Sequence, residues 1–247
     1  MNEKIKSEGK CLYCGKTFAK AGISRHLTTH LTEKTQTGKS GKSFFVKVET
    51  TNSRGSSPYF LRLWIDGETK LKELDTFLRD IWLECCGHMS AFIDPNHERG
   101  GWDIFDEPED SEEGDISMKR KTKSLFFKGL WIDYEYDFGS TTSLTITVID
   151  EYPVKADEKI VLLSRNEPLE ILCCKCKKAP ATQICTECMF EEDAEFCDKC
   201  AKKHAKKCEA FEDYSAMPVV NSPRMGECGY TGGIIDTERD GVFVMKA

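Results

Sequence analysis

The stretch Cys173–Cys208 reads CCKCKKAPATQICTECMFEEDAEFCDKCAKKHAKKC, and its cysteines fall in regularly spaced pairs. Three Cys-x2-Cys pairs recur every twelve residues, and a His-x3-Cys pair follows them. Each pair can direct two ligands at one metal ion, so the four pairs predict two tetrahedral zinc sites. The ligands are Cys173, Cys176, Cys185, Cys188, Cys197, Cys200, His204 and Cys208.

The segment between these ligands is poor in large apolar residues. Only Ile184, Met189, Phe190 and Phe196 are of that kind, so burial alone could not offset the entropy of ordering the chain. A structural zinc site can supply roughly 10–16 kcal/mol of apparent binding free energy. We therefore expect metal to hold this segment folded.

The ligands can be divided between two zinc ions in two ways. In a sequential arrangement, the last four ligands would share one ion across spacings of only two, three and three residues. In an interleaved arrangement, the first and third pairs hold one ion and the second and fourth pairs hold the other. The interleaved arrangement avoids the crowding and is favoured. Cys174 is a surplus thiol, interpreted as a bystander unless a shifted knuckle uses it in place of Cys173.

The interleaved pattern resembles B-box-type cross-brace modules and, more loosely, the MYND type. These families mostly bind proteins, so the resemblance implies a protein partner for residues 166–210. The RING pattern fits less well, because the histidine here stands in the last pair rather than near the middle. Ubiquitin-ligase activity is therefore not inferred.

Residues 1–31 carry a second metal motif. Two of its ligands belong to a hairpin turn and two to one face of a helix, with Phe18 and Ile23 as a small core beside the metal. The motif resembles the Cys2His2 zinc-finger family, with eleven rather than the usual twelve residues between the inner ligands. Its ligands are Cys11, Cys14, His26 and His30, which makes three zinc ions expected for the whole chain.

The finger lies at the basic end of an acidic chain. The whole chain carries a net charge of −7, whereas residues 1–43 hold nine Lys and Arg against three Glu, a net charge of +6. By the resemblance, the base-reading positions fall on Ala19, Gly22 and Arg25, and two of these cannot discriminate a base edge. We expect either a protein-contacting knob or weak, non-specific nucleic-acid binding. The candidate phosphate contacts are Lys10, Lys16, Lys20 and Arg25.

The middle of the chain alternates predicted strands with one helix. Residues 32–43, TEKTQTGKSGKS, are polar and rich in Gly and Ser, which predicts a flexible linker. The central domain follows at residues 44–165, with an acidic, solvated insertion at 94–121. The fold class is α+β, a mostly antiparallel sheet with one principal helix, flanked by small zinc-stabilised modules at both ends. Apolar patterning predicts strands at 44–48, 59–65, 88–93, 131–138, 144–149 and 159–163, and an amphipathic helix at 71–85.

The central domain resembles the family of plasmid open-reading-frame-three proteins, which includes the passenger protein beside an insertion-element transposase. The resemblance rests on Leu63-Trp64, the helix, His88-x3-Phe92 and above all on the hairpin YEYDFG at 134–139. That family usually continues with Asp-x-Trp-x-His, where this chain has Ser140, Thr142 and Leu144. The resemblance implies a prokaryotic, mobile-element-associated protein without an established activity.

Cysteine usage and the start of the chain bear on its location. The first residues, MNEKIKSEGK, contain no apolar signal segment, so we expect a reducing cytoplasm in which thirteen cysteines serve metal rather than disulfides. Cys85 and Cys86, at the end of the predicted helix, are interpreted as buried thiols. Residues 211–247 are predicted to dock as a C-terminal tail, although the loop around Arg224 and Cys228 also suits an anion-binding or reactive role.

Three functions remain open from the sequence. The leading hypothesis is a non-enzymatic zinc adaptor that binds a protein through residues 166–210. The second is a nucleic-acid-binding accessory or regulatory protein of a mobile element. The third is an enzyme that uses His88, Asp137 or Cys228, and it is the weakest, because only His88 and His97 are left unassigned among the histidines.

Overall fold

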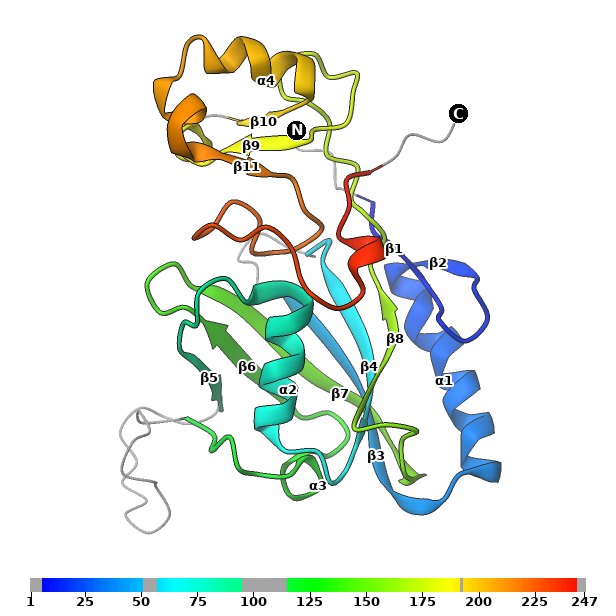
Figure 1. Cartoon of the computed structure of the whole chain (residues 1–247). Helices are drawn as coiled ribbons and strands as arrows, with labels where there is room; N and C mark the ends of the chain where they lie inside the picture. Colours follow the sequence, from blue (N-terminus) through cyan, green and yellow to red (C-terminus); the bar gives the residue numbers. More distant parts are fainter. Residues whose placement is uncertain (1–5, 51–56, 95–114, 192, 244–247) are drawn as a thin grey trace. The chain divides into compact units, whose positions relative to one another are not determined.

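A computed structural model describes residues 6–50, 57–94, 115–191 and 193–243 (Figure 1). Their contacts divide the chain into two units. The sheet unit consists of Glu8–Leu78 and His88–Asn166, and the C-terminal unit consists of Met1–Ser7, Arg79–Gly87 and Glu167–Ala247. The fold is α+β with antiparallel sheets and few helices, as the sequence predicted.

The sheet unit is built on six antiparallel strands in the order β5-β6-β7-β3-β4-β8. The hairpin predicted around residues 134–149 is formed by β6 and β7, in which Tyr134 lies opposite Leu144. Asp137 takes a positive φ of 63° in the turn between them. The strands are β3 Ser40–Thr50, β4 Phe60–Asp66, β5 Ser90–Ile93, β6 Trp131–Tyr136, β7 Thr142–Val154 and β8 Ile160–Arg165.

The predicted amphipathic helix ends earlier than its apolar pattern indicated. It runs as α2, Leu71–Leu78, and continues as a π-helical turn, Arg79–Leu83. Within the C-terminal unit, Ile234 N donates to the carbonyl of Asp80 at 2.7 Å, and Ser222 Oγ donates to that of Trp82 at 2.7 Å. Two residues of the tail thus form hydrogen bonds with two carbonyls of the turn. A short helix, α3 Thr122–Leu125, follows later in the sheet unit.

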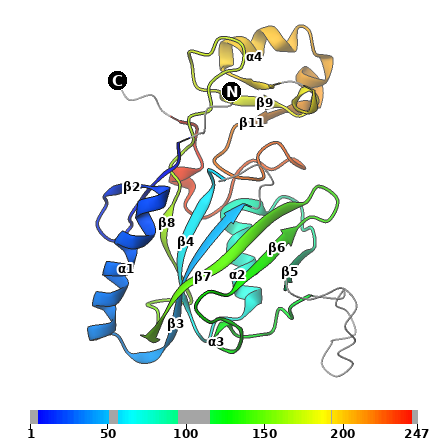
Figure 2. The same cartoon turned by 180° about the vertical axis from the view of Figure 1, so that it is seen from behind.

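The finger is a ββα unit made of β1 Glu8–Lys10, β2 Thr17–Ala19 and α1 Lys20–Thr37. Its helix lies in the sheet unit, alongside the sheet (Figure 2). Ile23, Leu27 and Leu31 are fully buried in a cluster that also contains Phe45 and Trp64. The finger is therefore packed on the sheet rather than joined to it by a flexible linker.

The flexible linker predicted at residues 32–43 is wrong. The structure places most of these residues in the end of α1 and the start of β3. A Cβ at Gly38, between the two elements, would lie 2.9 Å from the carbonyl oxygen of Lys34, so the close approach requires glycine. Apolar packing at Leu27 and Leu31 extends the helix where composition alone favours a loop.

The C-terminal unit contains a small antiparallel sheet in the order β10-β9-β11 and the helix α4 (Figure 1). Phe196, Ala201 and Phe211 are buried in its core, and Cys185 packs among them. The remaining elements are 3-10 or π-helical turns. The bounds are β9 Gln183–Cys185, η2 Cys188–Phe190, β10 Glu195–Phe196, α4 Asp198–Ala205, η3 Phe211–Ser215, β11 Ala216–Pro218 and η4 Thr237–Arg239.

Most of the predicted acidic insertion at 94–121, together with His97, lies outside the described residues. The described end of the insertion, from Asp115 onward, forms backbone contacts with other parts of the sheet unit. Asp115 forms a bridge with Ile93 of β5, and the amide of Leu71 donates to the carbonyl of Arg120 at 2.9 Å. The insertion thus returns along β5 and the start of α2. None of the helices among the described residues has the length and apolar content that a membrane span requires.

Candidate metal centres

The finger brings its predicted ligands together. The ligand atoms of Cys11, Cys14, His26 and His30 all lie within 4.8 Å of one another. His26 Nε2 is 3.2 Å from Cys14 Sγ and 3.2 Å from His30 Nε2. Burial lowers the pKa of His26, which favours the neutral imidazole that a metal requires. Phe18 stacks on the His26 ring at 4.1 Å between centroids and fixes its orientation.

The cysteine-rich module forms two groups, and they follow the interleaved arrangement. Cys176 Sγ lies 3.9 Å from Cys197 Sγ in the first group, and Cys185 Sγ lies 4.0 Å from Cys208 Sγ in the second. Sulfurs bound tetrahedrally to one zinc at 2.3 Å would be about 3.8 Å apart. Cys174 belongs to neither group, as expected. The first group is Cys173, Cys176, Cys197 and Cys200, and the second is Cys185, Cys188, His204 and Cys208.

The thiols of the second group differ sharply in acidity. Burial raises the pKa of Cys188 to about 12, and hydrogen bonds with Cys185 and Cys208 add to the rise. Burial acts to raise the pKa of Cys185, but hydrogen bonds from Ser215, His204 and Cys188 together lower the pKa to about 6. The Cys185 thiol therefore ionises readily, whereas the adjacent Cys188 thiol does not. A divalent cation would supply the positive charge that several adjacent thiolates need.

The first group shows the same contrast. Burial acts to raise the pKa of Cys173, but hydrogen bonds from backbone amides at Cys197 and Cys176 help to lower it to about 6. Burial raises the pKa of Cys200 to about 12, and hydrogen bonds with Cys173 and Cys197 add to this. Amide donors directed at a sulfur are typical of metal knuckles, because they stabilise the thiolate. Both groups are compatible with zinc.

Aromatic rings hold the histidine of the module in place. The His204 ring stacks on Phe196 at 4.3 Å and meets Phe211 edge-on at 5.0 Å. The two phenylalanines are buried in the core around Cys185. In the finger, Phe18 stacks on the His26 ring in the same way. Each histidine-containing group therefore has an aromatic ring packed against a histidine ligand.

The residues predicted to contact phosphate do not all face solvent. Lys10, Lys16 and Arg25 are exposed, whereas Lys20 donates to the Ser57 carbonyl at 2.6 Å and lies 3.5 Å from Glu49. Burial is the largest influence on the pKa of Lys20 and lowers it. Lys20 is therefore a docking residue that helps to hold α1 on the sheet, because the Ser57 carbonyl and the Glu49 carboxylate lie beside its ammonium group. The prediction that it contacts phosphate is corrected.

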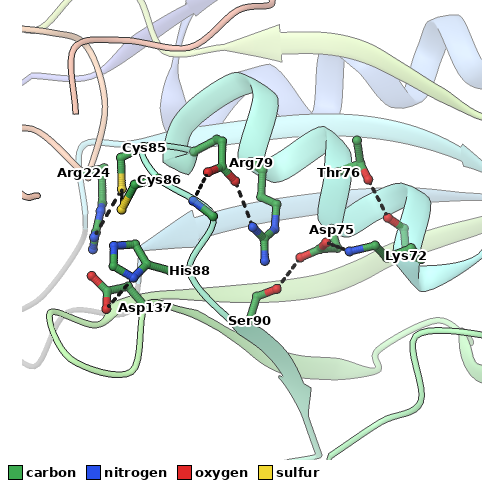
Figure 3. Close-up of polar contacts among 12 residues, drawn as sticks. Lys72, Asp75, Thr76, Arg79, Cys85, Cys86, His88, Ser90, Asp137 and Arg224 are labelled. Atoms are coloured by element: carbon green, nitrogen blue, oxygen red, sulfur yellow. Dashed lines mark hydrogen bonds and ion pairs between the residues drawn. The ribbon is translucent and has the colours of Figure 1, made fainter. Parts of the chain in front are cut away.

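A buried carboxylate in the sheet unit escaped the sequence reasoning. Asp75 on α2 is fully buried and accepts hydrogen bonds from Ser90 Oγ at 2.5 Å and Lys72 Nζ at 2.8 Å (Figure 3). It also accepts a hydrogen bond from Tyr134 OH at 2.9 Å. The available signal was an acidic residue on the apolar face of the helix, beside Leu74 and Leu78. Tyr134 belongs to the YEYDFG hairpin, so this part of the motif links sheet and helix.

The three residues of the enzyme hypothesis are divided between the two units. In the sheet unit, His88 Nδ1 lies 3.4 Å from Asp137 Oδ1 (Figure 3). The same carboxylate oxygen accepts from the amide of Gly139 at 3.0 Å, which stabilises the hairpin turn. Cys228 belongs to the C-terminal unit, where its sulfur lies 3.7 Å from that of Cys86. Cys86 is exposed and Cys85 is half-buried, so the prediction of buried thiols at these positions is wrong.

No family model matches the chain, and no curated protein matches it. Among solved structures, the chain is similar to a protein of unknown function from Methanosarcina mazei Go1, at 15% sequence identity and a TM-score of 0.36. The alignment covers 50% of this chain and 67% of that one. A likeness of this degree decides nothing about function, and the mobile-element-associated family stays a prediction.

Proposed function

We propose that this protein is a non-enzymatic, three-zinc adaptor that binds another protein through its C-terminal unit. The observation that carries the proposal is a pair of exposed aromatic side chains beside the second metal group. Phe190 is 79% exposed and Tyr214 is 73% exposed. Tyrosine and phenylalanine are enriched at protein interfaces, and tyrosine is frequent among the residues that dominate binding free energy.

The metal group rigidifies the turns that carry both rings. Phe190 ends the turn that begins at the ligand Cys188, and Tyr214 lies in the turn that follows the ligand Cys208. Tyr214 OH donates to Glu187 at 3.5 Å, which joins the second turn to the residue before Cys188. Ordering a side chain on a flexible loop would cost affinity on binding, whereas a metal-held turn has already lost that freedom. The expected partner is a protein with apolar pockets for two aromatic rings.

Zinc fits the ligand chemistry of the three groups. Each offers four cysteine or histidine ligands, enough to complete a tetrahedral zinc site, which is typical of structural rather than catalytic zinc. Soft thiolates in a closed tetrahedron exclude magnesium and calcium, which prefer oxygen. Zinc in these sites would act through the fold, by holding the exposed aromatic rings in place.

A groove in the C-terminal unit has no side chain of the kind that usually acts as a catalytic nucleophile. It has a volume of about 360 Å³ and is lined chiefly by Gln183, Asp198, Ala201, Lys202, Phe211 and Glu212. Its lining residues include no histidine, cysteine or serine that could act as a nucleophile. An adaptor therefore accounts for this unit better than an enzyme does.

The test is a double substitution, Phe190→Ala with Tyr214→Ala. The protein partner would first be isolated from cells of the native host and identified by mass spectrometry, then purified. We expect the double variant to bind the purified partner about 30-fold or more weakly, because two interface anchors cost about 2 kcal/mol or more. Binding would be measured by isothermal titration calorimetry with zinc-loaded protein.

The control is Phe127→Ala, a phenylalanine in the sheet unit that is 57% exposed. It should leave affinity unchanged, since it lies outside the C-terminal unit. Unchanged affinity in the Phe190/Tyr214 variant would eliminate this surface as the binding site. Equal weakening by Phe127→Ala would point instead to a site on the sheet unit.

Weak nucleic-acid binding by the finger is a second candidate function. It is favoured by one observation: Lys10, Lys16 and Arg25 are exposed, and none of them forms an ion pair with another described residue. Elsewhere in this basic segment, Lys34 pairs with Asp157 at 2.6 Å and Lys42 pairs with Glu151 at 3.2 Å. These pairs reduce the positive charge available to phosphate.

Replacing Lys16 and Arg25 with alanine should lower the salt dependence of duplex binding. Each phosphate contact adds about 0.9 to the slope of log affinity against log salt concentration, so the slope should fall by nearly two units. Fluorescence anisotropy on two unrelated duplexes across a salt series measures both slope and sequence preference. Lys20→Ala is the matched control and should not change the slope. Strong discrimination between the duplexes would contradict non-specific binding, and an absence of binding at low salt would leave the finger a protein-contacting element.

A further inference from the structure

A fourth group of metal-binding side chains lies in the C-terminal unit, away from the predicted zinc ligands. Cys85 and Cys86 follow the π-helical turn Arg79–Leu83, and Cys228 comes from the tail. The three sulfurs all lie within 4.8 Å of one another. Although 142 residues separate Cys86 from Cys228 in sequence, both belong to this unit. Three thiols from two segments far apart in the sequence therefore lie close enough together to bind one metal ion.

The spacing of these sulfurs matches that of the other groups. Cys86 Sγ lies 3.7 Å from Cys228 Sγ and 3.9 Å from Cys85 Sγ. The zinc module has sulfur separations of 3.9 and 4.0 Å in its two groups. Both sets agree with the separation of about 3.8 Å expected for thiolates around one tetrahedral zinc. The distances also exceed the roughly 2.0 Å of a disulfide, so the thiols are close but not bonded.

The backbone of the tail adopts a left-handed conformation at Cys228. Its backbone has a φ of +44°, between Gly226 at +85° and Gly229 at +70°. A left-handed conformation is unfavourable for a residue with a side chain, and such residues cluster at functional sites. Ser222 holds the same tail by donating to the Trp82 carbonyl at 2.7 Å. The loop therefore holds Cys228 Sγ beside Cys86 at a cost in backbone energy.

A buried arginine balances the charge of the thiols. Arg224 is fully buried, and its Nη2 lies 3.8 Å from Cys85 Sγ (Figure 3). Three thiolates and one divalent cation together carry a net charge of −1, which a guanidinium neutralises. The Arg224 guanidinium thus lies where it can offset part of the charge of a metal-bound thiolate at Cys85.

We propose that Cys85, Cys86 and Cys228 form a fourth metal site that takes up a thiophilic divalent cation such as Zn²⁺ and exchanges it with solution. Two of its thiols, Cys86 and Cys228, are exposed, in contrast to the half-buried or buried ligands of the zinc module. Three protein ligands leave one tetrahedral position open, as in zinc sites that bind an outside ligand. The site joins the helix end to the tail, so its occupancy would stabilise the docked tail.

The first test is metal content after equilibrium dialysis of the full chain against micromolar free Zn²⁺. We expect four zinc ions per chain for the wild type, and three for Cys86→Ser and Cys228→Ser, by elemental analysis. Cys174→Ser is the matched control, since Cys174 belongs to the same unit but to none of the groups, and it should retain four ions. Three ions in the saturated wild type, or four in both site variants, would overturn the proposal.

The second test uses the wild-type chain, so it does not depend on a variant that folds. Iodoacetamide labelling would be followed by peptide mass spectrometry with the three tight sites filled. Micromolar Zn²⁺ should slow alkylation of Cys86 and Cys228 about tenfold, because a metal-bound thiolate is a poorer nucleophile than a free one. The rate at Cys174 should not change. Equal rates with and without added Zn²⁺, or a disulfide between Cys86 and Cys228 in protein kept under reducing conditions, would refute the site.

Discussion

Removing metal should unfold residues 173–208 while the six-stranded sheet stays folded. The module has a small core, in which metal ligands such as Cys185 pack beside Phe196 and Phe211. Each structural zinc can supply roughly 10–16 kcal/mol of apparent binding free energy, which exceeds what so small a core can replace. The sheet has its own apolar core, with residues such as Phe44, Leu61 and Ile146 fully or almost fully buried.

Hydrogen exchange with and without a strong chelator measures both regions in one experiment. Amides in β9 and α4 should lose protection, whereas those in β3 and β7 should keep it. The α1 helix should also stay protected, since Ile23, Leu27 and Leu31 are buried among sheet residues. Elemental analysis of protein purified without added metal should first give three tightly held zinc ions, one for each predicted ligand group.

Adding zinc back after chelation is the control, and it should restore protection in β9 and α4. Loss of protection in the sheet together with the module would mean that the two fold as one cooperative unit. Two or fewer tightly held zinc ions at full occupancy would disprove the two-site assignment of the module.

Replacing Asp75 with alanine should destabilise the sheet unit by about 3 kcal/mol. The substitution leaves Tyr134 OH, which is fully buried, and Ser90 Oγ without the carboxylate that now accepts from both. A hydrogen bond to a charged group contributes about 1.5–3 kcal/mol, so losing the bonds from Tyr134 and Ser90 and leaving a small cavity accounts for the estimate. The free energy of unfolding would be obtained from urea titration, followed by the fluorescence of the tryptophans in the sheet unit.

Asp150→Ala is the matched control in the same unit. Its side chain is 31% exposed and pairs with Lys128 at 3.0 Å, so its loss should cost under about 1 kcal/mol. Asp75→Asn should fall between the two, because the amide oxygen can still accept one of the hydrogen bonds. A loss at Asp75→Ala no larger than at Asp150→Ala would show that the network contributes little to stability.

The ligand groups could be predicted from the sequence because metal chelation is largely local. A Cys-x2-Cys turn or a His-x3-Cys helix face sets the separation of two ligands from the chain spacing alone. Only the crowding argument was needed to choose the interleaved arrangement that the structure adopts. The antiparallel sheet was predicted for a similar reason, since alternating apolar residues in β6 and β7 and the turn between them are local signals.

Features that depend on contacts far apart in the chain were missed or misread. The linker prediction used the composition of residues 32–43, whereas Leu27 and Leu31 extend the helix by packing on a sheet formed later in the sequence. Asp75 was missed, because Tyr134, which donates a hydrogen bond to it, lies 59 residues away in the sequence. Local pattern cannot report which distant group will satisfy a buried charge.

The sequence by itself determined the three predicted metal-ligand groups and the α+β class, because spacing and periodicity act over a few residues. Only the tertiary structure decided that the finger packs on the sheet, that Lys20 serves docking rather than phosphate, and that Cys86 meets Cys228. Those outcomes depend on which surfaces the folded chain buries together. The physical reason is that burial and long-range hydrogen bonding are properties of the whole packed unit, whereas chelating pairs are properties of short segments.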